Sequence, residues 1–262
     1  MPRPALPLVL ATALALGMPA AAQDSDTLDS GLTGEALSDA ARELLREEIR
    51  AYLLDNPEVI FEAVAEYESR TAAAQADMDG ALVEINADEL FNDSTSWQGG
   101  NPDGDLILVE FMDYRCSFCR RAWEPMMDFV GSDGDVRVVI KELPILGRES
   151  DIMSRFAVSV LQLGGDAAYL AAHEALYAWQ GELDETSLQA LAVSLGLDGE
   201  AVLDRMEDDA VSEVLQRNRA LAQRLQINGT PSFILGDGLG GEMLRGMVPA
   251  EQFERVASEL RG

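Results

Sequence analysis

The stretch VEFMDYRCSFCRRAW, residues 109–123, contains the only two cysteines of this 262-residue chain, Cys116 and Cys119. A short apolar run, residues 106–112, leads into them between a glycine and an aspartate, which predicts a buried strand. A helical pattern follows the cysteines, and the apolar run 136–143 predicts a second buried strand. Strand, helix and strand in this order predict a βαβ unit with both cysteines at its first turn.

The spacing of the two cysteines favours redox chemistry. Residues three apart at the start of a helix lie on one face, one turn apart, within reach of a disulfide bond. The free N–H groups and partial positive charge of a helix N-terminus stabilise a thiolate. Cys116 is therefore predicted to be the solvent-facing nucleophile with a low pKa, and Cys119 the more buried resolving thiol. Arg115, Arg120 and Arg121 add positive charge beside them.

Other uses of two cysteines compete with this interpretation. A disulfide that closes so short a loop removes little entropy from the unfolded chain, so it would stabilise the fold weakly. A zinc site of four Cys or His ligands is excluded because the chain has one histidine, His173, which we expect to be a surface or partly buried helical residue. Two thiolates suit copper(I), so a periplasmic copper(I)-binding protein is the alternative function. Redox chemistry by the two cysteines requires no cofactor and no metal.

Two charged residues lie inside the predicted strands. Glu110 interrupts the first apolar strand, and Lys141, the sole lysine, interrupts the second. We expect them to pair in the interior beneath the cysteines. A carboxylate there can carry the proton that disulfide exchange moves.

The N-terminus has the three parts of a secretory signal peptide: Arg3, an apolar run over residues 6–16, and three alanines ending at Ala22. The apolar run is shorter than the roughly 20 residues that a membrane-spanning helix needs. We therefore predict cleavage near Ala22 and an exported, periplasmic protein. The formal net charge of −28 makes nucleic acid and anionic membrane surfaces poor partners.

The segments between the signal peptide and the βαβ unit differ in composition. Residues 23–36 are polar and predict a disordered leader. Apolar residues three and four apart predict helices within residues 37–91, divided at an Asn-Pro pair. Two short helices cannot bury an apolar stripe alone, so residues 37–78 must pack on the main domain or on copies of themselves. The turn-rich residues 92–103 predict a linker or loop.

Residues 104–262 form the predicted α/β domain. A helical insertion at about residues 150–225 separates the βαβ unit from two short strands, which a glycine-rich hairpin loop joins. Thr230 and Pro231 stand at the entry to the first of these strands, where a proline is tolerated because it donates no ladder hydrogen bond. A helix ends the chain.

This order of elements over residues 104–260 resembles the DsbA-type branch of the thioredoxin superfamily. The segments that carry the likeness are VEFMDYRCSFCRRA, VVIKELPIL and INGTPSFILGD. The resemblance implies a thioredoxin fold with a helical insertion, preceded by an N-terminal helical segment, and thiol-disulfide oxidoreductase activity. It implies that Pro231 is cis and lies against the cysteines, and that the Thr230 backbone binds an extended substrate. It also implies that Glu110 and Lys141 are the buried pair.

The segment IRAYLLDNPEVIFEAVAEYESR resembles the N-terminal region of ScsC-type proteins, periplasmic DsbA relatives linked to copper tolerance. Some of these trimerise through that region and act as disulfide isomerases, which implies a homo-oligomer through residues 37–78. The implied partners are cysteine-containing periplasmic proteins and a membrane redox partner that reoxidises or reduces the pair. Tyr114, Ser117 and Phe118 are the residues expected to line a substrate groove.

The residues between the cysteines depart from the strongest oxidants of that family, which carry Pro-His there. This chain carries Ser117-Phe118, so no imidazole stabilises the thiolate. A less oxidising pair is therefore expected, and oxidase, isomerase and reductase all stay open.

Overall fold

The computed structural model describes residues 37–181 and 183–262. The predicted signal peptide and leader therefore lie outside the described residues. The chain divides into two compact units, Met1–Ala63 and Val64–Gly262. The boundary falls inside the helix α2 (Glu58–Ile85).

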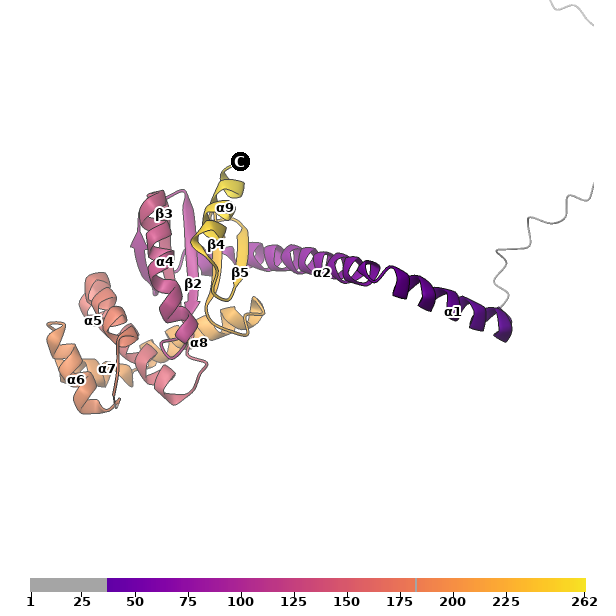
Figure 1. Cartoon of the computed structure of the whole chain (residues 1–262). Coiled ribbons are helices and arrows are strands. Elements are labelled where there is room, and N and C mark those ends of the chain that lie inside the picture. The colour runs from indigo at the N-terminus through magenta and orange to yellow at the C-terminus, as the bar shows by residue number, and fades with distance from the viewer. Residues whose placement is uncertain (1–36, 182) are drawn as a thin grey trace, which may run out of the picture. The chain divides into compact units, whose positions relative to one another are not determined.

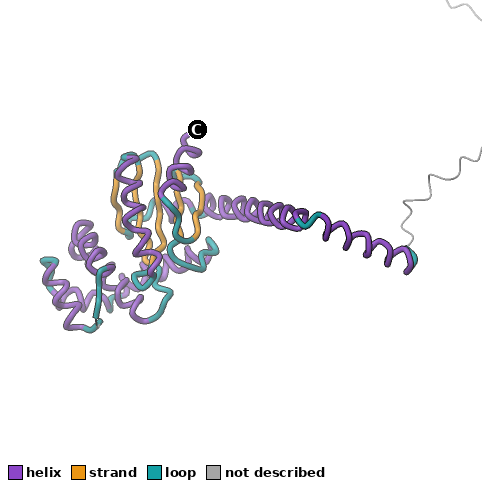
Figure 2. Tube along the Cα trace, in the orientation of Figure 1, coloured by secondary structure: helices purple, strands orange, loops and turns teal. Residues whose placement is uncertain are grey.

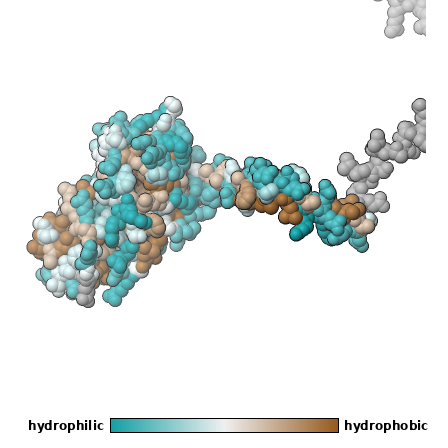
Figure 3. Space-filling model, viewed as in Figure 1, coloured by the Kyte–Doolittle hydropathy of each residue, from teal (hydrophilic) through white to brown (hydrophobic). Residues whose placement is uncertain are grey.

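The described part of the first unit is helical. Helix α1 (Asp39–Asp55) begins after Ser38, whose hydroxyl accepts a hydrogen bond from the backbone N–H of Ala41. None of the α1 side chains is buried. The large apolar side chains exposed in the described part of this unit are those of Leu37, Leu44, Leu45, Ile49, Tyr52, Leu54, Ile60 and Phe61. Figure 3 shows hydrophobic residues, in brown, on the surface of α1.

A five-stranded sheet forms the centre of the second unit, and Figure 2 shows its strands in orange. Its order is β1-β3-β2-β4-β5. The strands are β1 (Trp97–Gly100), β2 (Leu106–Met112), β3 (Val136–Glu142), β4 (Ser232–Gly236) and β5 (Gly241–Arg245). The pair β2 and β3 is parallel, and every other neighbouring pair is antiparallel. The βαβ unit and the closing hairpin are therefore present as predicted.

Helices cover both faces of the sheet. The remaining helices are α3 (Ala87–Phe91), α4 (Ser117–Asp133), α5 (Arg148–Tyr177), α6 (Glu185–Ser194), α7 (Gly199–Met206), α8 (Asp209–Arg224) and α9 (Ala250–Arg261). Side chains of α4, α5 and α9 pack on one face, in one core cluster with both cysteines. Side chains of α2, α3 and α8 pack on the other face. Figure 1 shows α4 and α9 running alongside the strands. We name the first face the cysteine face and the second the α8 face.

Alternation along the strands assigns each strand residue to one face. On β2, Leu106, Leu108 and Met112 belong to the cluster on the cysteine face, and the odd-numbered residues belong to the cluster on the α8 face. On β3 the even-numbered residues likewise point to the cysteine face, because Val136 stands opposite Leu106 of β2. Every residue of β2 is buried, as expected for a parallel strand that helices cover on both faces.

Residues 92–103, predicted to be a linker or loop, are a loop except at their centre. This segment contains β1, which pairs antiparallel with β3 and completes the sheet edge. Trp97 anchors it, because its ring is buried and its indole N–H donates to the backbone oxygen of Asp166 at 3.0 Å. The sequence of β1, WQGG, contains two glycines, which are depleted in strands, so composition concealed the strand.

Candidate active site

Both cysteines lie at the N-terminus of α4. Cys116 is the residue that caps the helix, and its sulfur accepts a hydrogen bond from the backbone N–H of Cys119 at 3.4 Å. Both are free thiols. Cys119 is fully buried and Cys116 is only 6% exposed. The expectation that Cys116 faces solvent therefore needs correction, and the reason is the segment that covers it.

That segment is Thr230-Pro231, at the entry to β4. The Sγ of Cys116 donates to the backbone oxygen of Thr230 at 3.2 Å. The Thr230–Pro231 peptide bond is cis, the geometry that the family resemblance implies. The oxygen of Pro231 accepts from the N–H of Gly246 beyond β5, so the hairpin holds this segment in place. The structure thus joins two motifs that are 114 positions apart in sequence.

The three residues expected to line a substrate groove separate into two groups. Ser117 and Phe118 are exposed, and the guanidinium of Arg121 lies 4.7 Å from the centre of the Phe118 ring. Tyr114 is fully buried, so its assignment to a groove was wrong. Its hydroxyl turns inward because it finds two polar partners there, Glu142 and His173.

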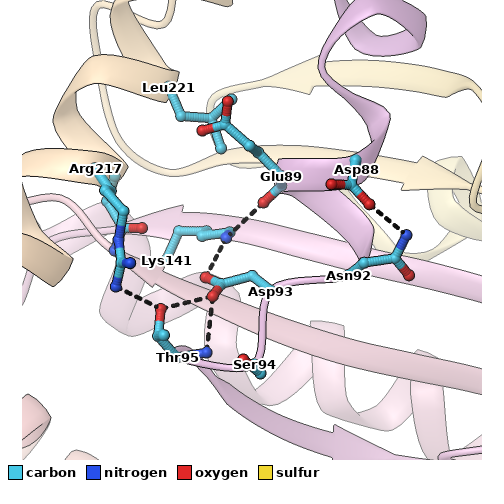
Figure 4. Close-up of a pocket in the computed structure, with 10 residues that line it drawn as sticks. Asp88, Glu89, Asn92, Asp93, Ser94, Thr95, Lys141, Arg217 and Leu221 are labelled. Carbon is cyan, nitrogen blue, oxygen red and sulfur yellow. Dashed lines mark hydrogen bonds and ion pairs between the residues drawn. The ribbon is translucent and has the colours of Figure 1, made fainter.

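Glu110 and Lys141 do not pair. Glu110 stands opposite Ile140 in the register of β2 and β3, so Lys141, one position further, points to the other face of the sheet. Lys141 instead forms an ion pair with Asp93 and donates to the backbone oxygen of Glu89 at 2.9 Å. Figure 4 shows these contacts in a pocket on the α8 face. The predicted buried pair was wrong because strand register places the two charges on opposite faces.

Glu110 lies on the cysteine face, away from Lys141. It is fully buried, and neither of its carboxyl oxygens has a hydrogen-bond partner among the described residues. Burial raises its pKa to about 8, and the negative charges of Glu142 and Cys116 add to this effect. Burial also raises the pKa of the Cys119 thiol, with a further contribution from Glu110. The site therefore contains a carboxyl that holds its proton at neutral pH near the buried thiol.

A second buried carboxyl, Glu142, was missed by the sequence analysis. One of its oxygens accepts from the hydroxyls of Tyr114 at 2.9 Å and Tyr169 at 2.6 Å. The other accepts from the hydroxyl of Ser154 at 2.7 Å. Glu142 is the last residue of β3, and like the other even-numbered residues of this strand it points to the cysteine face. The carboxyl thus links the end of β3 to Tyr114, in the loop between β2 and α4, and to α5.

His173 is fully buried, so the expectation of a surface or partly buried residue was wrong. Its Nδ1 lies 3.0 Å from the Tyr114 hydroxyl, and its ring packs 4.2 Å from that of Trp123 and 4.4 Å from that of Tyr177. Burial lowers its pKa to about 3, so the imidazole is neutral. Tyr169, His173 and Tyr177 are spaced by four on α5, and this stripe was the signal available in the sequence.

Among residues 37–181 and 183–262, no three His, Cys, Asp or Glu side chains are grouped to hold a metal ion. No helix in the same part of the chain is long and apolar enough to span a membrane.

Two family models match the chain. Residues 107–260 match the DSBA-like thioredoxin domain, and residues 42–74 match the copper resistance protein ScsC N-terminal domain.

Among the solved structures with the same fold, three match this chain over nearly their whole length. A thioredoxin-like oxidoreductase from Silicibacter pomeroyi DSS-3 is 38% identical, with a TM-score of 0.60, over 66% of this chain and 96% of that one. Proteus mirabilis ScsC in a transitional conformation is 30% identical, with a TM-score of 0.60, over 86% and 98%. Salmonella enterica Typhimurium BcfH is 26% identical, with a TM-score of 0.70, over 85% and 97%.

Curated relatives include the Na(+)/H(+) antiporter NhaA of Herminiimonas arsenicoxydans, which is 28% identical over 165 residues. That match covers 62% of this chain and 25% of the antiporter, so the chain spans about a quarter of that relative's length.

Proposed function

This chain belongs to the DSBA-like thioredoxin domain family, and on that premise we propose that it is an exported thiol-disulfide oxidoreductase acting on cysteine-containing proteins of the periplasm. The observation that carries the proposal is the placement of Cys116. It caps a helix one turn from a buried second thiol, and its sulfur lies against the Thr230 backbone. A structural disulfide would not require that contact with a segment so distant in sequence.

The proposed reaction uses both sulfurs and transfers two electrons. The Cys116 thiolate attacks a substrate disulfide, forms a mixed disulfide and releases one substrate thiolate. Cys119 then loses its proton to the ionised form of Glu110 and attacks Cys116 Sγ. The Cys116–Cys119 bond forms, the second substrate thiolate leaves, and the substrate is reduced. The reverse sequence oxidises a dithiol substrate.

The net direction in the cell depends on the reduction potential and on a redox partner. We propose that a membrane protein reoxidises or reduces the pair. Ser117-Phe118 supports a less oxidising potential than that of the strongest oxidants, because no imidazole lies between the cysteines. The chain's sole histidine does not replace it, since His173 is buried and neutral and contacts Tyr114.

Residues 37–78 are proposed to form a homo-oligomer. The support is the exposed apolar side chains of α1 and the match of residues 42–74 to the ScsC N-terminal domain. Several redox sites in one assembly suit the isomerisation of wrongly paired disulfides and hinder access of a membrane oxidase.

The test begins with the reduction potential of the mature protein in glutathione buffers. A value near that of strong periplasmic oxidants, about −120 mV, favours disulfide donation. A value of about −180 mV or lower favours an isomerase or reductase. A pair that does not exchange with glutathione in either direction contradicts the proposed activity.

Copper(I) binding by the same thiolates is the second candidate, favoured by the copper-resistance description of the N-terminal family model. The variant Cys119→Ser separates the two functions. A redox enzyme accumulates mixed disulfides through Cys116 in this variant and none in Cys116→Ser. A copper(I)-binding protein loses the metal in both variants and traps no substrate.

A further inference from the structure

Glu110 and Glu142 share the cysteine face of the sheet. Glu142 stands opposite Met112 in the register of β2 and β3, two positions beyond the row of Glu110 and Ile140. Strand spacing and rise put the Cα atoms of the two glutamates about 8 Å apart. Both side chains are buried, at 0% and 2% exposure. Two carboxyls therefore occupy one low-dielectric layer next to the redox pair.

Their surroundings differ. Glu142 accepts three hydrogen bonds, from Tyr114, Tyr169 and Ser154, while Glu110 accepts none. Hydrogen bonds donated to a carboxylate favour its ionised form. A first negative charge on this pair therefore resides on Glu142, and a second charge on Glu110 must form against it. The two carboxyls therefore differ in how readily they ionise, and each has a separate role.

The remaining polar groups around Glu142 supply no positive charge. Besides Glu110, the groups that interact with its carboxyl are Asp113 and Tyr114, which follow β2, and Ser154, Tyr169 and Tyr177 on α5. His173 reaches Glu142 only through the Tyr114 hydroxyl and is neutral. Lys141, its chain neighbour, is turned to the other face and paired with Asp93.

We propose that Glu142 is a positioning residue of the redox site: its carboxylate, held by three hydroxyls, opposes a negative charge on Glu110 and so stabilises the protonated form of that carboxyl. This inference rests on the proposed function. The Cys119 sulfur takes up the Glu110 proton when the disulfide is reduced. Glu142 helps Glu110 to retain that proton, although Glu142 touches neither sulfur.

The directions of the two pKa shifts agree with this assignment. Burial raises the pKa of Glu142 to about 7, against the lowering effect of Tyr169, Ser154 and Tyr114. Burial and then the charge of Glu142 raise the pKa of Glu110 to about 8. The hydrogen-bond donors thus favour the ionised form of Glu142, and the charge of Glu142 favours the protonated form of Glu110.

The experiment compares full-length mature protein with Glu142→Gln, which removes the charge and keeps an oxygen acceptor. The rate at which Cys119 resolves a mixed disulfide of Cys116 with glutathione is measured from pH 5.5 to 9.5. In the wild type the profile should inflect near pH 8, and Glu110→Gln should remove that inflection. In Glu142→Gln the inflection should move down by about one pH unit, because a like charge at this distance is lost. Glu174→Gln, an exposed position on α5, is the matched control and should leave the profile unchanged.

The outcomes separate two failures. If Glu110→Gln removes the inflection and Glu142→Gln leaves it at the wild-type pH, this inference is wrong while the proposed function stands. If neither cysteine variant affects exchange with glutathione, the proposed function itself is wrong. A second measurement avoids dependence on the folding of Glu142→Gln: carboxyl ¹³C NMR of both glutamates in the wild-type protein from pH 5.5 to 9.5. Glu142 should ionise first and Glu110 at higher pH, and ionisation of Glu110 before Glu142 overturns the assignment.

Discussion

Lys141 and Asp93 form an ion pair on the face of the sheet opposite the cysteines, although 48 positions separate them in sequence. Burial alone would raise the pKa of Asp93, but the charge and hydrogen bond of Lys141 lower it well below its ordinary value, with help from Ser96 and Thr95. The sole lysine of the chain therefore stabilises the fold through this ion pair. Glu110, on the cysteine face, has no cation or hydrogen-bond donor beside its carboxyl oxygens within the described part of the chain.

Replacing Lys141 with Met should lower stability without changing the redox site. The substitution leaves Asp93 largely buried without its cation, so we expect the free energy of unfolding to fall by about 3 kcal/mol in urea titrations. The double variant Asp93→Asn, Lys141→Met should recover part of this loss. The reduction potential should stay at the wild-type value in both. A shift in potential would instead indicate that Lys141 acts on the cysteines.

Replacing Glu110 with Gln should slow the step that uses Cys119. The thiol of Cys119 is buried with a raised pKa, so its deprotonation depends on a nearby acceptor. We expect the release of glutathione from the Cys116 mixed disulfide to slow on the order of 10²-fold in stopped-flow measurements. Alkylation of Cys116 by iodoacetamide is the control and should keep its rate. Equal slowing of both reactions would point to a disturbed helix terminus rather than lost proton transfer.

The reduced protein should lose stability as the pH rises from about 5 to 9. The pKa values of Glu110 and Glu142 are about 8 and 7 in the folded state, above the ordinary value of 4.5. Below pH 4.5 both states bind the protons and these groups add no pH dependence. Above it the unfolded chain releases them first, so the free energy of unfolding falls until the pH passes the folded values. Urea midpoints at pH 5.5 and 8.5 test this, and the variant with Gln at both positions should show a flatter profile. A wild-type midpoint that rises over this range contradicts the prediction.

Local signals in the sequence were enough to locate the redox pair. The placement of Cys116 and Cys119 at a helix start, and of Thr230-Pro231 at a strand entry, follows from short-range patterns that each segment carries by itself. Their contact across 114 positions came from the family resemblance, since no local pattern reports it.

The faces of the two central strands could not be predicted in the same way. Both strands are buried on both sides, so no alternation of apolar and polar residues marks which side chains point to the cysteines. Glu110 and Lys141 consequently looked like partners, and Asp93 lay in a segment taken for a linker. The burial of His173, by contrast, could have been predicted from the sequence. Its spacing of four from Tyr169 and Tyr177 places the three side chains on one face of α5, as expected for a face that packs in the core.

The exposed stripe of α1 should control the oligomeric state. Leu45 and Ile49 lie one turn apart and are about half exposed, at 48% and 49%. A stripe of this kind is stabilised by burial against copies of itself, and a buried charge there would oppose assembly. In sedimentation velocity we expect Leu45→Asp and Ile49→Asp to convert an oligomer to the monomer mass, with the reduction potential unchanged. Arg46→Asp introduces the same carboxylate at a neighbouring exposed position, where the ion pair with Glu43 contributes little, and should leave the oligomer intact. A wild-type protein that sediments as a monomer at micromolar concentration would rule out assembly through this helix.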